Sequence, residues 1–119
     1  MIAKKIPNWI KELDDDSADK ELLTQIARTS KRPIETPREF NFMITKFKSQ
    51  EDAENAGYYI QQQGWICKVG IDSNMLYWLE ATKNFYVIDK NQLFIDEAEF
   101  VRIATQYGAT YDGWYAEEV

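Results

Sequence analysis

Residues 65–81 read WICKVGIDSNMLYWLEA, and this stretch decides the predicted fold. Apolar side chains take every second position on both sides of the polar tripeptide Asp72-Ser73-Asn74. The alternating set is Trp65, Cys67, Val69 and Ile71 before the tripeptide, and Met75, Tyr77, Leu79 and Ala81 after it. A period of two is typical of strands with one buried face, and such a tripeptide is typical of a turn. The stretch therefore predicts an antiparallel hairpin in which Cys67 is a small core side chain.

A helix and a strand are predicted before this hairpin. Ser49 is suited to be a helix N-cap, and the helix that follows has one apolar face and ends at Gly64. That face is formed by Ala53, Ala56 and Ile60. Residues 39–47, EFNFMITKF, are rich in the aromatic and β-branched residues that favour strands.

The same pair of elements is predicted after the hairpin. Asp89 can cap a helix that ends at Gly108, although residues 92–95 could instead form a strand followed by a helix from Asp96. We favour the longer helix. Residues 109–116, ATYDGWYA, form the last predicted strand. Acidic neighbours such as Glu97 and Glu99 are interpreted as first-turn helix acids rather than as acid-base machinery.

From residue 39 onward the predicted order is β-α-β-β-α-β, which is the split βαβ pattern. Two right-handed crossovers then place both helices on one face of a four-stranded antiparallel sheet whose first and third strands are central. The sequence therefore predicts an α+β fold, a ferredoxin-like βαββαβ sandwich, for residues 38–119.

Residues 1–37 are predicted to be a helical extension and a linker. Two turns of helical spacing in residues 1–17 indicate a short docked helix, and residues 18–29 have the pattern of an amphipathic helix. Pro33 and Pro37 then interrupt helical geometry. The amphipathic helix is expected to cover the sheet face away from the crossover helices with Leu22, Leu23 and Ile26.

The dipeptide Asp112-Gly113 is a strong hairpin signal, yet only six residues follow it. It therefore either closes a very short terminal ribbon or lies inside the last strand. In the second case Tyr111 and Gly113 point to one face, Asp112 and Trp114 point to the other, and the glycine permits a close approach by a neighbour.

The composition excludes several kinds of site. The chain has 119 residues, which fits one domain, and it contains one cysteine and no histidine. Internal disulfides, the usual Cys/His zinc sites and His-activated nucleophiles are thereby excluded, so we expect no enzyme, no metal and no cofactor. No apolar run reaches the ~20 residues that span a bilayer, so we expect a cytoplasmic protein without a membrane partner.

The net charge of −6 is unevenly distributed. The stretch from Arg28 to Lys48 contains six basic residues and two acidic ones, so the rest of the chain has a net charge of about −10. The basic residues are Arg28, Lys31, Arg32, Arg38, Lys46 and Lys48. An acidic protein is repelled by nucleic acid at long range, so RNA binding would need this stretch to form one patch.

Four segments in this order resemble the RraB-like family, named for a regulator of ribonuclease E activity. They are ELLTQIA at 21–27, TPREF at 36–40, QEDAENAGYYIQQQGW at 50–65 and YGATYDGW at 107–114. The likeness runs from about residue 21 to residue 116, and YDGW is its most specific element. It implies a ferredoxin-like sandwich and a non-catalytic protein that binds an endoribonuclease and reduces its activity.

The predicted function is therefore regulation of an endoribonuclease, and hence of RNA turnover, by binding a protein partner. The residues predicted to contact that partner are Tyr111, Asp112, Trp114, Trp78, Glu117 and Glu118. The YDGW residues also have a structural interpretation, with Tyr111 in the core and Trp114 covering an edge. The alternatives are an immunity-type protein that neutralises a basic nuclease toxin, and a single-stranded RNA binder that uses Trp78, first-strand aromatics and residues 28–38.

Overall fold

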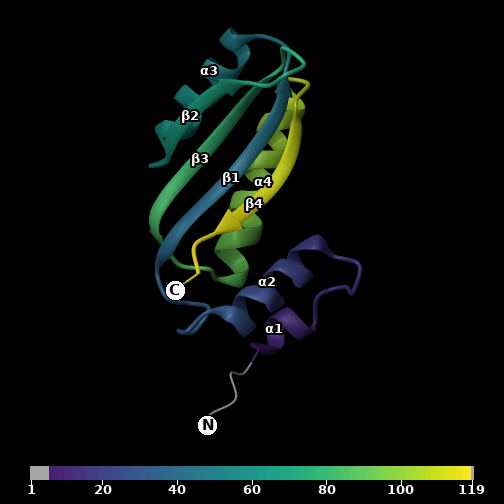
Figure 1. Cartoon of the computed structure of the whole chain (residues 1–119), viewed down its shortest axis with the longest axis vertical. Coiled ribbons are helices and arrows are strands. Elements are labelled where there is room, and N and C mark those ends of the chain that lie inside the picture. Colours follow the sequence, from purple (N-terminus) through teal and green to yellow (C-terminus); the bar gives the residue numbers. More distant parts are fainter. Residues whose placement is uncertain (1–5, 119) are drawn as a thin grey trace.

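The computed structural model describes residues 6–118, which form one four-stranded sheet and four helices (Figure 1). The helices are α1 (Asn8–Lys11), α2 (Ala18–Thr29), α3 (Gln50–Gln61) and α4 (Lys90–Gln106). The strands are β1 (Arg38–Phe47), β2 (Ile66–Ile71), β3 (Tyr77–Tyr86) and β4 (Thr110–Ala116). None of the helices within residues 6–118 is long and apolar enough to cross a membrane.

The strand order is β2-β3-β1-β4, and every neighbouring pair is antiparallel. The predicted α+β fold with a four-stranded antiparallel sheet is thus confirmed, and β1 and β3 are the central strands. The hairpin forms as predicted, with Asp72 Oδ1 accepting hydrogen bonds from the amides of Asn74 and Leu76 at 2.8 and 3.1 Å. Met75 was wrongly placed in the second strand: it lies in the turn at φ 63°, and its side chain is exposed.

The core lies between the sheet and α3 and α4, which pack on the same sheet face. Phe42 of β1 stacks on Phe100 of α4 with ring centroids 4.4 Å apart. Leu79 of β3 lies under α3, where a Cβ built on Gly57 would come within 3.3 Å of it. Ile44 pairs with Leu79 and follows Phe42 by two positions, so these side chains share one face.

Cys67 of β2 also lies on this face, beneath Gly57 of α3. Its side chain is half-buried, and burial raises the pKa of the thiol to about 11. The interpretation of Cys67 as a small core side chain agrees with this position, because the neutral thiol is both a poor nucleophile and a poor metal ligand.

The helix after the hairpin starts where the longer alternative placed it. Asp89 Oδ1 accepts hydrogen bonds from the amides of Asn91 and Gln92 at 3.0 and 3.1 Å, and α4 begins at Lys90. The strand alternative for residues 92–95 is wrong, since Leu93 is fully buried within the helix. Two amides at the start of α4 are therefore satisfied by a single side chain.

The dipeptide Asp112-Gly113 lies inside β4 as a β-bulge and does not close a terminal hairpin. Along β1 the partner of Met43 is Gly113, whereas the partner of Ile44 is Tyr111, so β4 carries one extra residue. Tyr111 and Trp114 consequently both face the helices, and the prediction that they face opposite sides is wrong.

The glycine of this bulge is needed for its backbone conformation. Gly113 has φ +101°, in the region that residues with a Cβ rarely adopt. A Cβ at this position would meet nothing within 4 Å, so the predicted close approach by a neighbour is wrong.

The N-terminal helices pack at one end of the sheet, beside α4 and β4, and do not cover the open face (Figure 1). Ile10 and Leu23 are fully buried there and join the main core. The predicted cover of the open face by α2 is therefore wrong: Ile66 and Tyr115, which lie on that face, are 64% and 48% exposed. An amphipathic pattern shows that one face of a helix is buried but not which surface buries it. Residues 1–5 of the predicted extension lie outside the described part.

Candidate partner-binding surfaces

The residues predicted to bind a partner fall in three separate places. Tyr111, Asp112 and Trp114 line a groove between α2, α4 and β4. Glu118 lines a hollow at the end of the sheet, next to Glu117. Trp78 lies on the open sheet face, because it alternates with the buried Leu79. The structure therefore does not bring these six residues together into one site.

The first place, which we call the YDGW groove, is a depression of about 490 Å³. Its walls come from the start of α2, the middle of α4 and the bulged part of β4. It is lined by Ser17, Ala18, Asp19, Leu22, Glu97, Val101, Tyr111, Asp112, Gly113 and Trp114. The bulge shapes this groove, because it turns both aromatic residues of YDGW toward the helices.

Two carboxylates meet two aromatic side chains in the groove. Tyr111 Oη donates a hydrogen bond to Glu97 Oε2 at 2.6 Å, and Trp114 Nε1 donates one to Asp19 Oδ1 at 2.9 Å. Trp114 is only 5% exposed and stacks on Phe40 with ring centroids 4.9 Å apart. The indole ring of Trp114 therefore contributes mainly to the stability of the fold, whereas Asp112 is exposed at the rim of the groove.

Glu97 is a carboxyl group of the groove whose pKa is raised well above its ordinary value. Burial, followed by a hydrogen bond and charge repulsion from Asp19, raises the pKa of Glu97 to about 7, and the hydrogen bond from Tyr111 opposes this shift. The interpretation of Glu97 as a first-turn helix acid is wrong, because α4 begins at Lys90. Asp19 and Glu97 were both missed as site residues. The preferred helix start at Asp89 already placed Glu97 well inside the helix, and that was the available signal.

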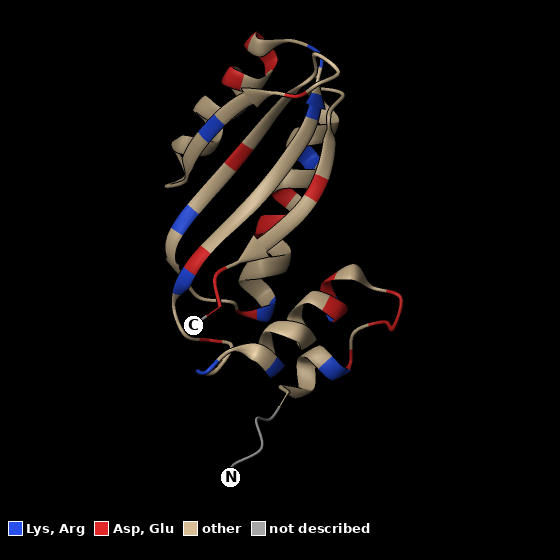
Figure 2. Ribbon diagram, viewed as in Figure 1, with Lys and Arg blue, Asp and Glu red and all other residues tan. Residues whose placement is uncertain are grey.

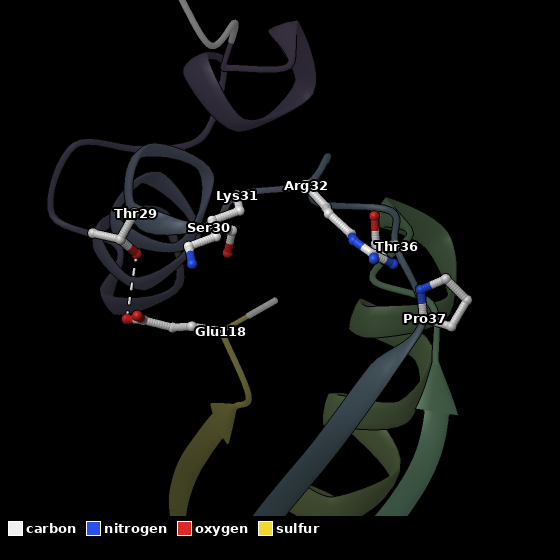
Figure 3. Close-up of a pocket in the computed structure, with 7 residues that line it drawn as sticks. All are labelled: Thr29, Ser30, Lys31, Arg32, Thr36, Pro37 and Glu118. Atoms are coloured by element: carbon white, nitrogen blue, oxygen red, sulfur yellow. Dashed lines mark hydrogen bonds between the residues drawn. The ribbon is translucent and has the colours of Figure 1, made fainter.

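The second place is an open hollow of about 520 Å³ between the end of α2, the linker and the end of β4 (Figure 3). It is lined by Thr29, Ser30, Lys31, Arg32, Thr36, Pro37 and Glu118. Figure 3 shows the carboxylate of Glu118 approaching Thr29, whose Oγ1 donates a hydrogen bond to it at 3.3 Å. The hollow therefore mixes exposed basic side chains with an acid from the end of the described chain.

Arg38 does not contribute to the surface of that hollow. The sequence placed it in a basic surface stretch, but its side chain is buried and hydrogen-bonded. That part of the prediction is wrong, and the exposed basic residues around the linker are Arg28, Lys31 and Arg32.

The third place is the open sheet face, which looks toward the viewer in Figure 1. Trp78 lies over Gly70 of the neighbouring strand, since a Cβ built on that glycine would clash with the indole ring. Met43 and Tyr115 share this face, and Tyr115 Oη donates a hydrogen bond to Glu80 across β1. The face therefore carries a few aromatic side chains among polar ones.

A model of a known protein family matches most of the chain. The family model RraB, described as regulator of ribonuclease activity B, matches residues 16–115. The matched range includes α2, the whole sheet apart from its last residue, and every residue that lines the YDGW groove. None of the curated proteins searched matches the chain.

Proposed function

Since this chain belongs to the RraB family, we propose that it is a non-catalytic regulatory protein that binds an endoribonuclease of the ribonuclease E type and inhibits or modulates it. Binding would change the lifetime of RNA in the cytoplasm. The family match over residues 16–115 is the observation that carries this proposal. The strand order and the two helices on one face support the ferredoxin-like arrangement that we propose for the family unit.

The proposed mechanism is occlusion by an acidic surface. Figure 2 shows acidic positions along the loop before α2, on α4 and on β4. They include the loop acids Asp14, Asp15 and Asp16 and the groove acids Asp19, Glu97 and Asp112. Such a surface is complementary to a basic region of a ribonuclease, where its docking would block access of RNA or of scaffold partners. Complementary charge accelerates association and makes it sensitive to salt.

The test is an RNA-cleavage assay with the ribonuclease fraction of the host. Purified protein in increasing molar excess should slow cleavage, and the effect should weaken at high ionic strength because the interaction is screened. Cleavage that stays unchanged at a large excess of protein in low salt would contradict the proposal.

A direct RNA-binding function is the second candidate, and the uncovered sheet face favours it. Trp78 and the half-exposed Tyr115 lie on that face, where aromatic side chains can stack on bases. Titration with single-stranded RNA at low salt should change the tryptophan fluorescence if this candidate is correct. An unchanged spectrum removes it.

A further inference from the structure

We propose that the YDGW groove seats an arginine or lysine side chain from a basic segment of the ribonuclease partner. The inference deepens the proposed function and rests on it. It assigns the contact to one groove and to one chemical group, a guanidinium or ammonium ion.

The groove has the apolar walls that a partner side chain needs. Leu22 of α2 and Val101 of α4 face it from two helices, and Val101 is 43% exposed. The alkyl stem of an arginine or lysine can pack against such surface while its charged head reaches a polar end. Here the polar end is formed by Asp19 and Glu97.

The charge of the groove is unbalanced. Its titratable carboxyl groups are Asp19, Glu97 and Asp112, and none of the residues that line it is a lysine or arginine. Both ion pairs recorded among residues 6–118 lie elsewhere, at Lys20–Asp15 and Arg102–Glu99.

Asp19 and Glu97 hold their positions through neutral donors. Trp114 Nε1 binds one oxygen of Asp19, and Tyr111 Oη binds one oxygen of Glu97. These bonds orient the two carboxyl groups and bring no positive charge to them, and Glu97, with a pKa of about 7, is partly protonated near neutral pH. A guanidinium group presents its N–H groups as a planar fork that suits carboxylate oxygens, so arginine is the better occupant.

We expect Glu97 to release its proton when the arginine or lysine side chain binds, because of the groups that surround it. Asp19 faces it from α2, Tyr111 faces it from β4, and Tyr86 of β3 and Asp112 at the rim lie near it. Burial and neighbouring acids raise the pKa of both tyrosines, so they stay neutral near pH 7. A cation in the groove stabilises the ionised form of Glu97. With a free pKa of about 7, and with the protonated form binding about tenfold more weakly, affinity should therefore rise about fivefold from pH 6 to pH 8.

The probe is a synthetic peptide of alternating arginine and alanine, with a control peptide in which neutral citrulline replaces each arginine. The readout is the indole N–H resonance of Trp114, assigned with a W114F variant. We expect the arginine peptide to shift this resonance saturably, whereas the citrulline peptide and a single-stranded oligonucleotide leave it unchanged. The resonance of Trp78, on the open face, should not move.

Three variants test the residues. D19N and E97Q should each weaken peptide affinity about tenfold at pH 8, and E97Q should also remove the dependence on pH. E51Q is the matched control, because Glu51 is an exposed acid at the start of α3, away from the groove. Unchanged affinity in both D19N and E97Q, or a shift of Trp78 in place of Trp114, overturns the proposal. Near-ultraviolet circular dichroism checks that each variant is folded.

The cleavage assay separates this inference from the proposed function. If wild-type protein inhibits cleavage and D19N and E97Q inhibit equally well, the groove assignment is wrong and the function stands. If wild-type protein does not inhibit, the function is wrong. A peptide that fails to move the Trp114 resonance disproves the groove contact in either case.

Discussion

At the scale of single residues, Arg38 is a charged side chain in a buried position, where its guanidinium needs hydrogen-bond partners. Its guanidinium makes five hydrogen bonds, to Ser30 Oγ and to four backbone carbonyl oxygens. The carbonyls belong to Pro33, Ile34, Thr36 and Glu117. Burial lowers the pKa of Arg38, while Glu117 and Glu35 oppose that shift through their charges. Arg38 thereby ties the linker to the end of β4.

Replacing Arg38 by lysine should destabilise the protein by about 2–4 kcal/mol. The ammonium group has three donors in place of five, so buried carbonyl groups lose their partners. Urea denaturation of R38K measures the loss. R32K is the control, because Arg32 is exposed, and it should stay within about 0.5 kcal/mol of wild type. Equal stability of the two variants would contradict this account of Arg38.

Gly113 gives a second prediction at this scale. G113A should cost roughly 1–2 kcal/mol, because alanine is strained at φ +101° although its Cβ has free space. Thermal denaturation measures the cost, and D112A, at the neighbouring exposed position, is the control. If G113A is as stable as wild type, the bulge can relax into regular strand pairing. Since Tyr111 and Trp114 would then move to opposite faces, the hydrogen bond from Trp114 to Asp19 should be lost with it.

At the scale of elements, the sequence correctly predicted the features that depend on residues close together in the chain. The alternation in 65–81 predicted the hairpin, and the caps Ser49 and Asp89 predicted the starts of α3 and α4. Each signal is local: a period, a turn or a side chain that accepts a hydrogen bond from an amide close by.

Features that depend on contacts between segments far apart in the sequence were not predicted. The bulge in β4 exists only with respect to β1, so simple alternation gave the wrong face for Trp114. The acids Asp19 and Glu97 belong to different helices and meet only after α2 has docked. The position of Glu97 inside the helix showed that it is not a first-turn acid, but nothing near either residue showed that the two acids meet. The aromatic half of the groove was found because YDGW is distinctive as a motif.

The cap of α4 is the element whose contribution is simplest to measure. D89A should destabilise the protein by about 1 kcal/mol, because the amides of Asn91 and Gln92 lose their acceptor. Hydrogen exchange should also accelerate in the first turn of α4. K90A, one position further along and exposed, is the control and should leave that exchange unchanged. Faster exchange throughout α4 in both variants would contradict a local capping role.

At the scale of the whole molecule, the YDGW groove joins the N-terminal helices to the rest of the chain. The molecule is elongated, 51 × 28 × 27 Å, with α1 and α2 at one end (Figure 1). Buried side chains of α2 and the bond from Trp114 to Asp19 hold that end together. The same contact brings two acids close to each other, so its strength should depend on pH.

Glu97 should make the protein less stable as the pH rises. Its pKa is about 7 when folded, against an ordinary value of 4.5, so the folded state keeps this proton to higher pH than the unfolded chain does. The stabilisation is complete below pH 4.5 and is lost as the pH rises through 7. After allowance for screening at this half-buried group, the loss is about 1–2 kcal/mol.

The measurement is the free energy of unfolding of wild type minus that of E97Q across this range of pH. The difference should fall as the pH rises, since glutamine does not titrate. A difference that stays constant with pH would show that Glu97 titrates alike in both states. E51Q again serves as the control and should leave the pH profile of wild type unchanged.

The position of Cys67 beneath α3 has a practical consequence. Its sulfhydryl is almost entirely un-ionised at neutral pH, and an alkylating reagent attacks only the ionised form. Modification should therefore proceed mainly during brief excursions in which α3 lifts away from β2. The rate of alkylation of Cys67 would therefore report how often α3 separates from β2, with no engineered label.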